Sequence, residues 1–370
     1  MKVSPLLTSS LTSFVVAAAA LSAAACNDTA APTSATPSVT LDRNTVNPAE
    51  DYSFVVVGCN RVDKTDTAGN PSTANIVQLR RTLQEIAKLP KRPRFLFFAG
   101  DLTLGYTSDT VQLATELRAW RALYEASPLA KSGTELVAIP GNHETQDASK
   151  IAYAAAERTW LRVMDPYIKR GGNGPKAGGP DNLATDQSRL TYSFDFAGAH
   201  FITLNTDPVG NDWHVPTQWV AADIQKAHAA GAKHIFAIGH KPAYPYPTVP
   251  TDGLAKFPAS RDSLWNALIA GNAEAMFSAH NHVYFRAQPI TGKTWQVIAG
   301  NGGSSLETTI DLSIPSSGEY YGFVVTTVRP DGRVYAKSYG RDVPAAGYIA
   351  MAPESLYPTT VRDSVELTQH

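Results

Sequence analysis

Five predicted strands, each followed by a residue able to bind metal or carry a proton, constrain the fold of this 370-residue chain most strongly. Each strand is a short apolar run that ends in one or two small residues or a proline–glycine pair. The residues delivered after the five runs are Cys59, Asp101, Asn142 with His143, His240, and His280 with His282. Because the carboxyl ends of strands in a mostly parallel sheet face one crevice, we expect these side chains to converge in space.

The segments between these strands predict helices. Apolar residues follow helical spacing from Ile76 to Ile86 and again from Leu113 to Tyr124, and residues 216–230 form an amphipathic pattern closed by Gly231. Strands that alternate with helices indicate an α/β fold. We therefore expect a four-layer α-β-β-α sandwich, in which helices flank two mixed sheets.

Three other segments have distinct patterns. Residues 171–189 are rich in glycine and polar residues, which predicts an irregular, mobile flap or rim loop. Residues 190–206 alternate apolar and polar residues on either side of Ala197–Gly198, which predicts an antiparallel hairpin with one face in solvent. The chain after about Gly340 is less regular.

The amino terminus has the composition of an export signal. Residues 1–25 contain one charged residue and an apolar stretch, and small residues then precede Cys26, so residues 1–26 predict a cleaved signal peptide in which Cys26 becomes lipidated. Secretion with cleavage nearby is the alternative. Residues 27–50 are poor in large apolar side chains and predict a flexible linker. The folded domain is then expected over residues 51–340, with a carboxyl-terminal tail over residues 341–370.

The overall charge gives no sign of a polyanionic partner. The chain has 32 basic and 33 acidic residues, a net charge of −1, and no long run of lysine and arginine. Nucleic-acid polymers are therefore not indicated as partners. Any anionic substrate must be held by local groups.

The strand-end residues together predict a metal centre. The Asp101 carboxylate can bridge two ions, while the Asn142 oxygen and imidazoles complete a site suited to transition metals. Two ions ~3.5–4 Å apart hold a hydroxide between them and bind phosphoryl oxygens. His143, which follows a ligand but points elsewhere, is then the candidate to protonate or stabilise a leaving oxygen.

These motifs resemble those of the calcineurin-like metallophosphoesterases, which include purple acid phosphatases and cyclic nucleotide phosphodiesterases. The resemblance runs from about Phe54 to Arg286, with looser support from the glycine-rich segment at residues 299–306. The matching motifs are Gly100-Asp101, Gly141-Asn142-His143-Glu144, His240 and Ala279-His280-Asn281-His282. The resemblance implies that Asp101 bridges two metals, that Asn142, His240 and His280 complete one ion, that His282 binds the other, and that His143 serves the transition state.

Two positions depart from the family pattern. The opening aspartate motif is replaced by Cys59-Asn60-Arg61, so one carboxylate ligand is absent. Cys59 is then a thiolate ligand favouring zinc or iron, or a small buried residue beside a weakened or empty site, or its role passes to Asp63. The tyrosine of purple acid phosphatases also fails to align, because Leu104 stands at its position and Tyr106 follows two residues later.

The leading hypothesis is an exported, lipid-anchored phosphoesterase of the cell envelope, either periplasmic or surface-facing. It would hydrolyse small phosphate mono- or diesters with a hydroxide bound to two divalent or trivalent ions of zinc, iron or manganese. The alternative is a catalytically weak surface lipoprotein that binds metal or phosphate on the same fold. A nuclease or nucleotidase is a third hypothesis, in which Tyr244, Tyr246 and Tyr284 stack a base.

Overall fold

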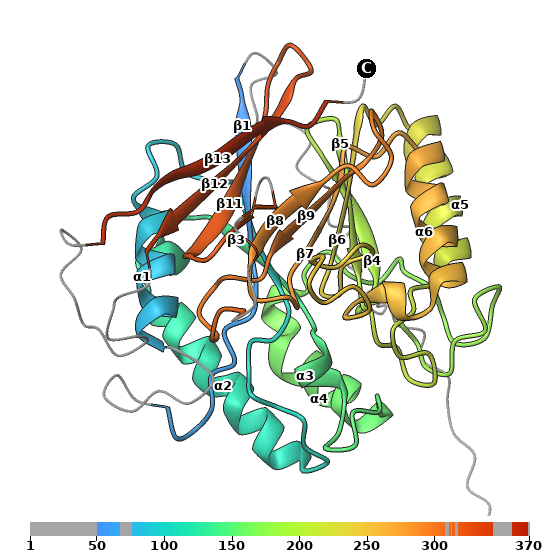
Figure 1. The fold of residues 1–370 in the computed structure, drawn as a ribbon. Helices are drawn as coiled ribbons and strands as arrows, with labels where there is room; N and C mark the ends of the chain where they lie inside the picture. Colours follow the sequence, from blue (N-terminus) through green and yellow to red (C-terminus); the bar gives the residue numbers. More distant parts are fainter. Residues whose placement is uncertain are drawn as a thin grey trace, which may run out of the picture. The chain divides into compact units, whose positions relative to one another are not determined.

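Two mixed β-sheets pack face to face between two groups of helices, as predicted (Figure 1). The computed structural model describes residues 50–66, 76–307, 311, 313–314, 317–342 and 357–368. The predicted signal peptide with Cys26, and the linker apart from Glu50, lie outside the described residues. The four-layer α/β sandwich expected from the sequence is therefore confirmed.

The first sheet has the strand order β13-β12-β11-β1-β2-β3. Strands β1, β2 and β3 are parallel, whereas β11 pairs antiparallel with β1 on its other side. The bounds are β1 Tyr52–Val57, β2 Phe95–Ala99, β3 Glu135–Ile139, β11 Tyr321–Val328, β12 Val334–Arg341 and β13 Thr360–Glu366. The three parallel strands deliver Cys59, Asp101 and Asn142 at one edge of the sheet.

The second sheet has the order β10-β8-β9-β7-β6-β5-β4. Its parallel part, from β5 through β6 and β7 to β9, delivers His240 after β6 and His280 after β7. The bounds are β4 Tyr192–Phe196, β5 Ala199–Leu204, β6 His234–Gly239, β7 Ala275–Ser278, β8 Tyr284–Ala287, β9 Trp295–Ala299 and β10 Ser317–Gly318.

Phenylalanine rings fill the space between the sheets. The ring of Phe54 in β1 lies 5.2 Å from Phe201 in β5 and 5.0 Å from Phe236 in β6, in both cases edge to face. Phe97 in β2 stacks on Phe201 at 5.4 Å. Because successive strand residues point to opposite faces, neighbours such as Ile202 pack outward instead. Large rings in mutual contact stabilise this core through buried area and ring geometry.

Helices cover both outer faces. On the first sheet, α1 places Leu79 and Leu83 in the main core, and Trp120 of α2 packs edge to face against Phe98 at 4.8 Å. On the second sheet, α5 and α6 form a separate apolar cluster with outward residues of β5, β6 and β7. The helices are α1 Ile76–Ala87, α2 Thr110–Ala126, α3 Asn142–Thr145, α4 Ala154–Met164, α5 Thr217–Ala229 and α6 Pro258–Ala270, with short 3-10 turns at Leu129–Lys131, Asp165–Tyr167 and Leu254–Lys256.

Two expectations for strands need correction. The hairpin of β4 and β5 forms as predicted, but it does not face solvent, because every residue of β5 is buried. One face of β5 lies in the phenylalanine core and the other lies under α5, which alternation alone does not reveal. The less regular chain expected after Gly340 includes β13, which pairs antiparallel with β12 and so extends the first sheet.

Residues 171–189 are irregular, as predicted, and are tied to a neighbouring helix. The carboxylate of Asp181 accepts hydrogen bonds from the backbone N–H groups of Gln218 and Trp219 in the first turn of α5, at 2.8 and 2.9 Å. A carboxylate at this position satisfies free N–H groups and the positive end of the helix. The mobility of this segment stays a prediction.

His200 makes stability depend on pH. Its two ring nitrogens contact Asp195 at 2.7 Å and Asp223 at 2.9 Å; burial lowers the pKa of His200, but these hydrogen bonds raise it overall to about 9. Because the folded-state pKa is raised, this stabilisation is complete below about pH 6.5 and is lost as pH rises through about 9. We expect His200→Gln to cost on the order of 2 kcal/mol more in acid than in alkali. Urea unfolding on both sides of this range measures the difference. The control is His228→Gln, because the ring of His228 contacts the backbone carbonyl of Gly271 at 2.9 Å and not a carboxylate.

Candidate metal centre

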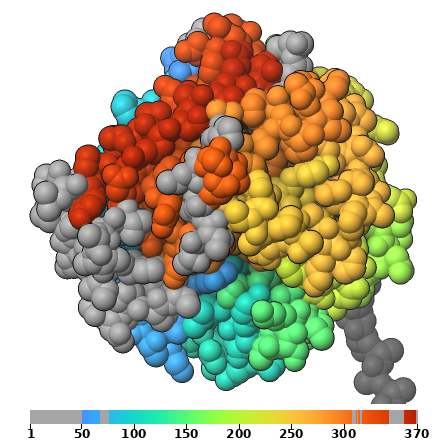
Figure 2. Space-filling model, in the orientation of Figure 1, coloured from blue at the N-terminus to red at the C-terminus, as the bar shows by residue number. Residues whose placement is uncertain are grey.

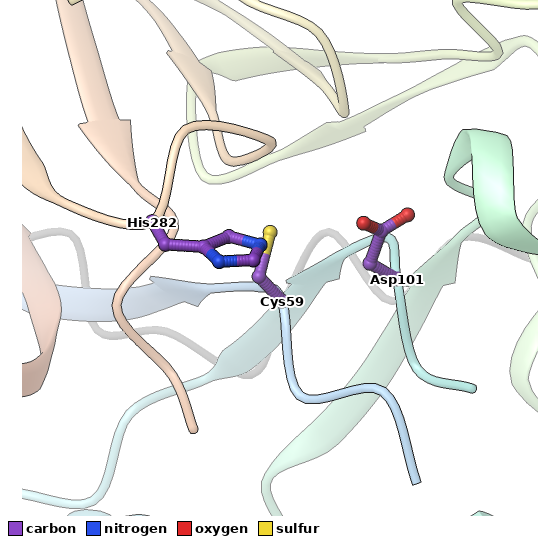
Figure 3. Close-up of side chains that lie close together, drawn as sticks. All are labelled: Cys59, Asp101 and His282. Carbon is purple, nitrogen blue, oxygen red and sulfur yellow. The ribbon is translucent and has the colours of Figure 1, made fainter. Parts of the chain in front are cut away.

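The strand ends of both sheets meet in two clusters that share Asp101. Ligand-type atoms of Asp101, His240 and His280, here called the histidine cluster, lie within 4.8 Å of one another. Atoms of Cys59, Asp101 and His282, the thiol cluster, do so as well, and Figure 3 shows them arriving from three separate strand ends. On the molecular face drawn in Figure 2, blue, teal and yellow-orange segments, far apart in sequence, adjoin. All five residues of the two clusters are buried.

The histidine cluster is arranged around one oxygen of Asp101. Nε2 of His240 lies 3.0 Å from Oδ1 of Asp101 and 3.1 Å from Nδ1 of His280. The backbone N–H of His143 donates to the same oxygen at 3.3 Å, which holds the start of α3 against Asp101. Asn142 donates through Nδ2 to the hydroxyl of Tyr106, whereas its Oδ1 is buried with no hydrogen-bond partner among the described residues. This buried amide oxygen, one residue before the N–H that binds Asp101, is a candidate metal ligand.

In each site histidine, the outer ring nitrogen is already bound. Nδ1 of His240 donates to the carbonyl of Ala99 at 2.7 Å, and Nε2 of His280 donates to Asp252 at 3.0 Å. Nδ1 of His282 contacts the carbonyl of Ser305 at 2.6 Å, and Nδ1 of His143 contacts that of Leu104 at 2.5 Å. Such contacts with a carbonyl or a carboxylate hold each ring in one orientation, as in metal-binding histidines.

The thiol cluster is poorer in charge. The sulfur of Cys59 accepts a hydrogen bond from the backbone N–H of His280 at 3.1 Å, and burial together with the Asp101 charge raises the pKa of the thiol well above its usual range. Burial and the positive charge of Arg61 lower the pKa of His282 to about 3, and Nε2 of His282 has no hydrogen-bond partner among the described residues. The cluster therefore offers a neutral thiol, a neutral imidazole and one oxygen of Asp101.

Asp101 is the electrostatic centre of both clusters. Burial raises the pKa of its carboxyl, but His143, His240 and Arg61 together hold it well below its usual range. Arg61 donates to Oδ2 of Asp101 from Nε at 3.1 Å and from Nη2 at 3.0 Å. Burial lowers the pKa of His143 to about 3, and its Nε2 lies 3.7 Å from the same oxygen.

The turns that carry these side chains use unusual backbone geometry. Cys59, Arg61, Asp101 and His280 have φ angles of 59°, 58°, 55° and 67°, in the left-handed region that residues with a side chain rarely occupy. Such angles cluster at functional sites, where the surroundings hold the chain in place. The glycine-rich segment contributes here, since Gly302 N–H donates to the Gly58 carbonyl at 3.0 Å.

Gly141 has no space for a side chain. A Cβ atom there would lie 2.4 Å from Oδ1 of Asp101 and 3.1 Å from Cε1 of His240. We therefore expect Gly141→Ala to displace Asp101 and to weaken metal binding at the histidine cluster at least ~10-fold. Calorimetric titration with Mn²⁺ or Zn²⁺ measures the effect. The control is Gly198→Ala outside the site, where a Cβ meets nothing within 4 Å, although Gly198 has a φ of 82° and Gly141 one of −101°. Equal metal affinity in both variants would contradict the prediction.

Three residues with roles at the site were not identified from the sequence. Glu144 lies within a quoted motif, and its carboxylate accepts from the backbone N–H groups of Asp101, Thr103 and Gly141 at 2.8–3.0 Å. Asp252 orients His280, and Arg61 pairs with Asp101. Glu144 could have been identified as the fourth residue of the motif that begins at Gly141. No local pattern in the sequence identifies the partners of Asp252 and Arg61.

Two sequence-based assignments receive no support from the geometry. Asp63, the alternative ligand to Cys59, accepts from the backbone and hydroxyl of Thr65 in a local turn and belongs to neither cluster. Tyr246 and Tyr284 are buried, and their hydroxyls bind Asp311 and Asp363, so these rings offer no stacking surface for a base.

Comparisons with known proteins agree with these motifs. The family model for calcineurin-like phosphoesterases matches residues 53–284. Purple acid phosphatase 23 of Arabidopsis thaliana is 25% identical over 202 residues, which are 53% of this chain and 39% of that protein. Purple acid phosphatase 21 of the same plant is 24% identical over 144 residues, 37% of this chain and 32% of that protein. The chain thus spans less than half the length of these relatives.

The fold also resembles a solved structure. Purple acid phosphatase PPD1 from yellow lupin (Lupinus luteus) seeds superimposes with a TM-score of 0.59 at 16% identity, over 86% of this chain and 54% of that one. At this identity the likeness concerns the fold alone. In the part of the chain that the structure describes, no helix is both long and apolar enough to cross a membrane.

Proposed function

Because this chain belongs to the calcineurin-like phosphoesterase family, we propose that it hydrolyses small phosphate mono- or diesters with a metal ion held at the histidine cluster. The observation that carries the proposal is the convergence of Asp101, His240 and His280 within 4.8 Å, together with the buried oxygen of Asn142, which has no partner among the described residues. One carboxylate, one amide oxygen and two imidazoles suit zinc, iron or manganese.

The residues at the histidine cluster have separate roles in the proposed reaction. When bound, the ion supplies a hydroxide from water and positive charge for phosphoryl oxygens. Asp101, Asn142, His240 and His280 hold it, and the contacts of Ala99 and Asp252 keep both imidazoles aimed inward. His143 faces the same centre through Nε2 and is our candidate to assist the leaving oxygen.

The sequence also predicts a second ion, for which the thiol cluster is the candidate site. Of its three ligand-type groups only Asp101 carries a formal charge, and that residue is shared with the histidine cluster. The proposed reaction therefore rests on the histidine cluster, whose donors are complete without Cys59.

Activity with several metals tests the proposal directly. Protein freed of metal should gain turnover of 4-nitrophenyl phosphate or bis(4-nitrophenyl) phosphate when zinc, iron or manganese is restored, whereas calcium should give none. Absence of turnover with every metal, despite one bound ion per chain, would favour the alternative of a surface protein that binds metal or phosphate.

Location in the cell envelope is a further part of the proposal. The small residues before Cys26 support export followed by lipid attachment to that cysteine. We expect Cys26→Ser to abolish incorporation of labelled palmitate and to move the protein from the membrane fraction to the soluble fraction. Labelling of the variant equal to that of the native chain would rule out the anchor.

A further inference from the structure

We propose that the guanidinium of Arg61 is the resident cation of the thiol cluster, so that this phosphoesterase works with one metal ion and one arginine. The inference rests on the proposed function and specifies how the same site binds phosphate. Arg61 then contacts a phosphoryl oxygen of the substrate at the position where a second ion would otherwise stand.

The two carboxylate oxygens of Asp101 have different partners. Oδ1 faces the histidine cluster, with Nε2 of His240 at 3.0 Å. Oδ2 receives two hydrogen bonds from Arg61, at 3.0 and 3.1 Å. A carboxylate that bridges two metal ions offers one oxygen to each, and here a guanidinium already occupies the second place.

The two clusters contain little negative charge to balance bound cations. Asp101 is the one carboxylate in the two clusters, and the other groups are imidazoles and the thiol of Cys59. Glu144 lies nearby, but both its oxygens accept backbone N–H groups. A single carboxylate is a poor counter-charge for two dications, whereas one ion and one guanidinium demand less of it.

The backbone fixes Arg61 in this position. Its N–H donates to the carbonyl of Asp101 at 2.9 Å, and the N–H of Cys59 donates to Gly100 at 3.0 Å, so the two segments run side by side. A φ of 58° at Arg61 turns the side chain toward Asp101. The Cys59 sulfur accepts a hydrogen bond from the N–H of His280 at 3.1 Å.

Arg61 also keeps N–H donors for a substrate. Nε and Nη2 each use one N–H on Asp101, and no other hydrogen bond of the guanidinium is found among the described residues. Its side chain is 18% exposed, whereas that of Asp101 is fully buried. The remaining N–H groups match the geometry of a phosphoryl group, which arginine binds through paired hydrogen bonds.

Metal counting is the primary test. After removal of metal and dialysis against Mn²⁺ or Zn²⁺, the native protein should contain one ion per chain by elemental analysis. Cys59→Ala should also contain one, and Arg61→Ala should bind that ion within about 3-fold of the native affinity. Two tightly bound ions in the native chain would overturn the inference.

Phosphate binding and turnover complete the test. For Arg61→Ala we expect orthophosphate affinity to fall at least ~10-fold and kcat/KM to fall ~100-fold or more, with partial recovery when methylguanidinium is added. Arg61→Lys, which keeps the charge but loses the paired donors, should recover less than half of the native kcat/KM. Retained phosphate affinity and turnover in Arg61→Ala would also overturn the inference.

A matched control is available in Arg170. It pairs with Glu135 at 2.8 Å through the same two nitrogens and has a side chain 16% exposed, but it lies outside both clusters. Arg170→Ala should leave metal content and phosphate affinity unchanged. If the native protein binds one ion and phosphate but has no turnover, the proposed hydrolysis fails while the role of Arg61 in phosphate binding is still measured.

Discussion

Replacing Asp101 by asparagine is expected to lower kcat/KM for phosphate esters at least ~1000-fold. Asparagine keeps the shape of the side chain but removes the charge that both clusters share. Its amide nitrogen would also face either the Arg61 guanidinium or Nε2 of His240, where Asp101 now accepts hydrogen bonds. Steady-state kinetics and the metal content of the purified variant measure the loss.

The control for this variant is a buried carboxylate away from the centre. Asp223 pairs with His200 at 2.9 Å, and Asp223→Asn should change stability without changing kcat/KM. Circular dichroism establishes that both variants are folded. A folded Asp101→Asn protein with native turnover would contradict the proposed mechanism.

The second large effect is expected at Glu144. Its carboxylate satisfies the backbone N–H groups of Asp101, Thr103 and Gly141, and it also accepts from the Thr103 hydroxyl at 3.2 Å. Alanine at this fully buried position leaves three N–H donors without a partner and creates a cavity. Since each such donor costs roughly 1–3 kcal/mol, we expect Glu144→Ala to lower the free energy of unfolding by about 3–5 kcal/mol. The shift of the urea midpoint measures it.

Glu157 provides the comparison for Glu144. It is also buried, but most of its hydrogen bonds come from the side chains of Thr185 and Gln187, which can turn toward other partners. Glu157→Ala should therefore cost less than Glu144→Ala. Equal losses of unfolding free energy in the two variants would mean that the three backbone hydrogen bonds of Glu144 add no stability beyond that of side-chain hydrogen bonds.

The sequence predicted the parts of the fold that repeat a local pattern. The apolar spacing from Ile76 to Ile86 became α1, and the strand ends at Asp101 and His240 brought their ligands together. The solvent-facing hairpin at β4 and β5 was wrong because its cover, α5, comes from a later segment. Strand β13 was missed because its residues are mostly exposed and lack an apolar pattern.

The candidate site was likewise predicted only in part. Residue types at strand ends predicted where ligands meet, because a parallel sheet brings those ends to one edge. The pairing of Arg61 with Asp101 depends on two left-handed turns and a side-chain direction, which spacing does not encode. Asp252 reaches His280 from a loop 28 residues earlier, so no local motif joins them.

The left-handed turns at Cys59, Arg61, Asp101 and His280 bear on how such a chain changes under mutation. At each position glycine would relieve roughly 1 kcal/mol of backbone strain. None of the four is glycine in this chain. The chain therefore holds four side chains at these turns, Cys59 included, at a cost in backbone energy that glycine would avoid.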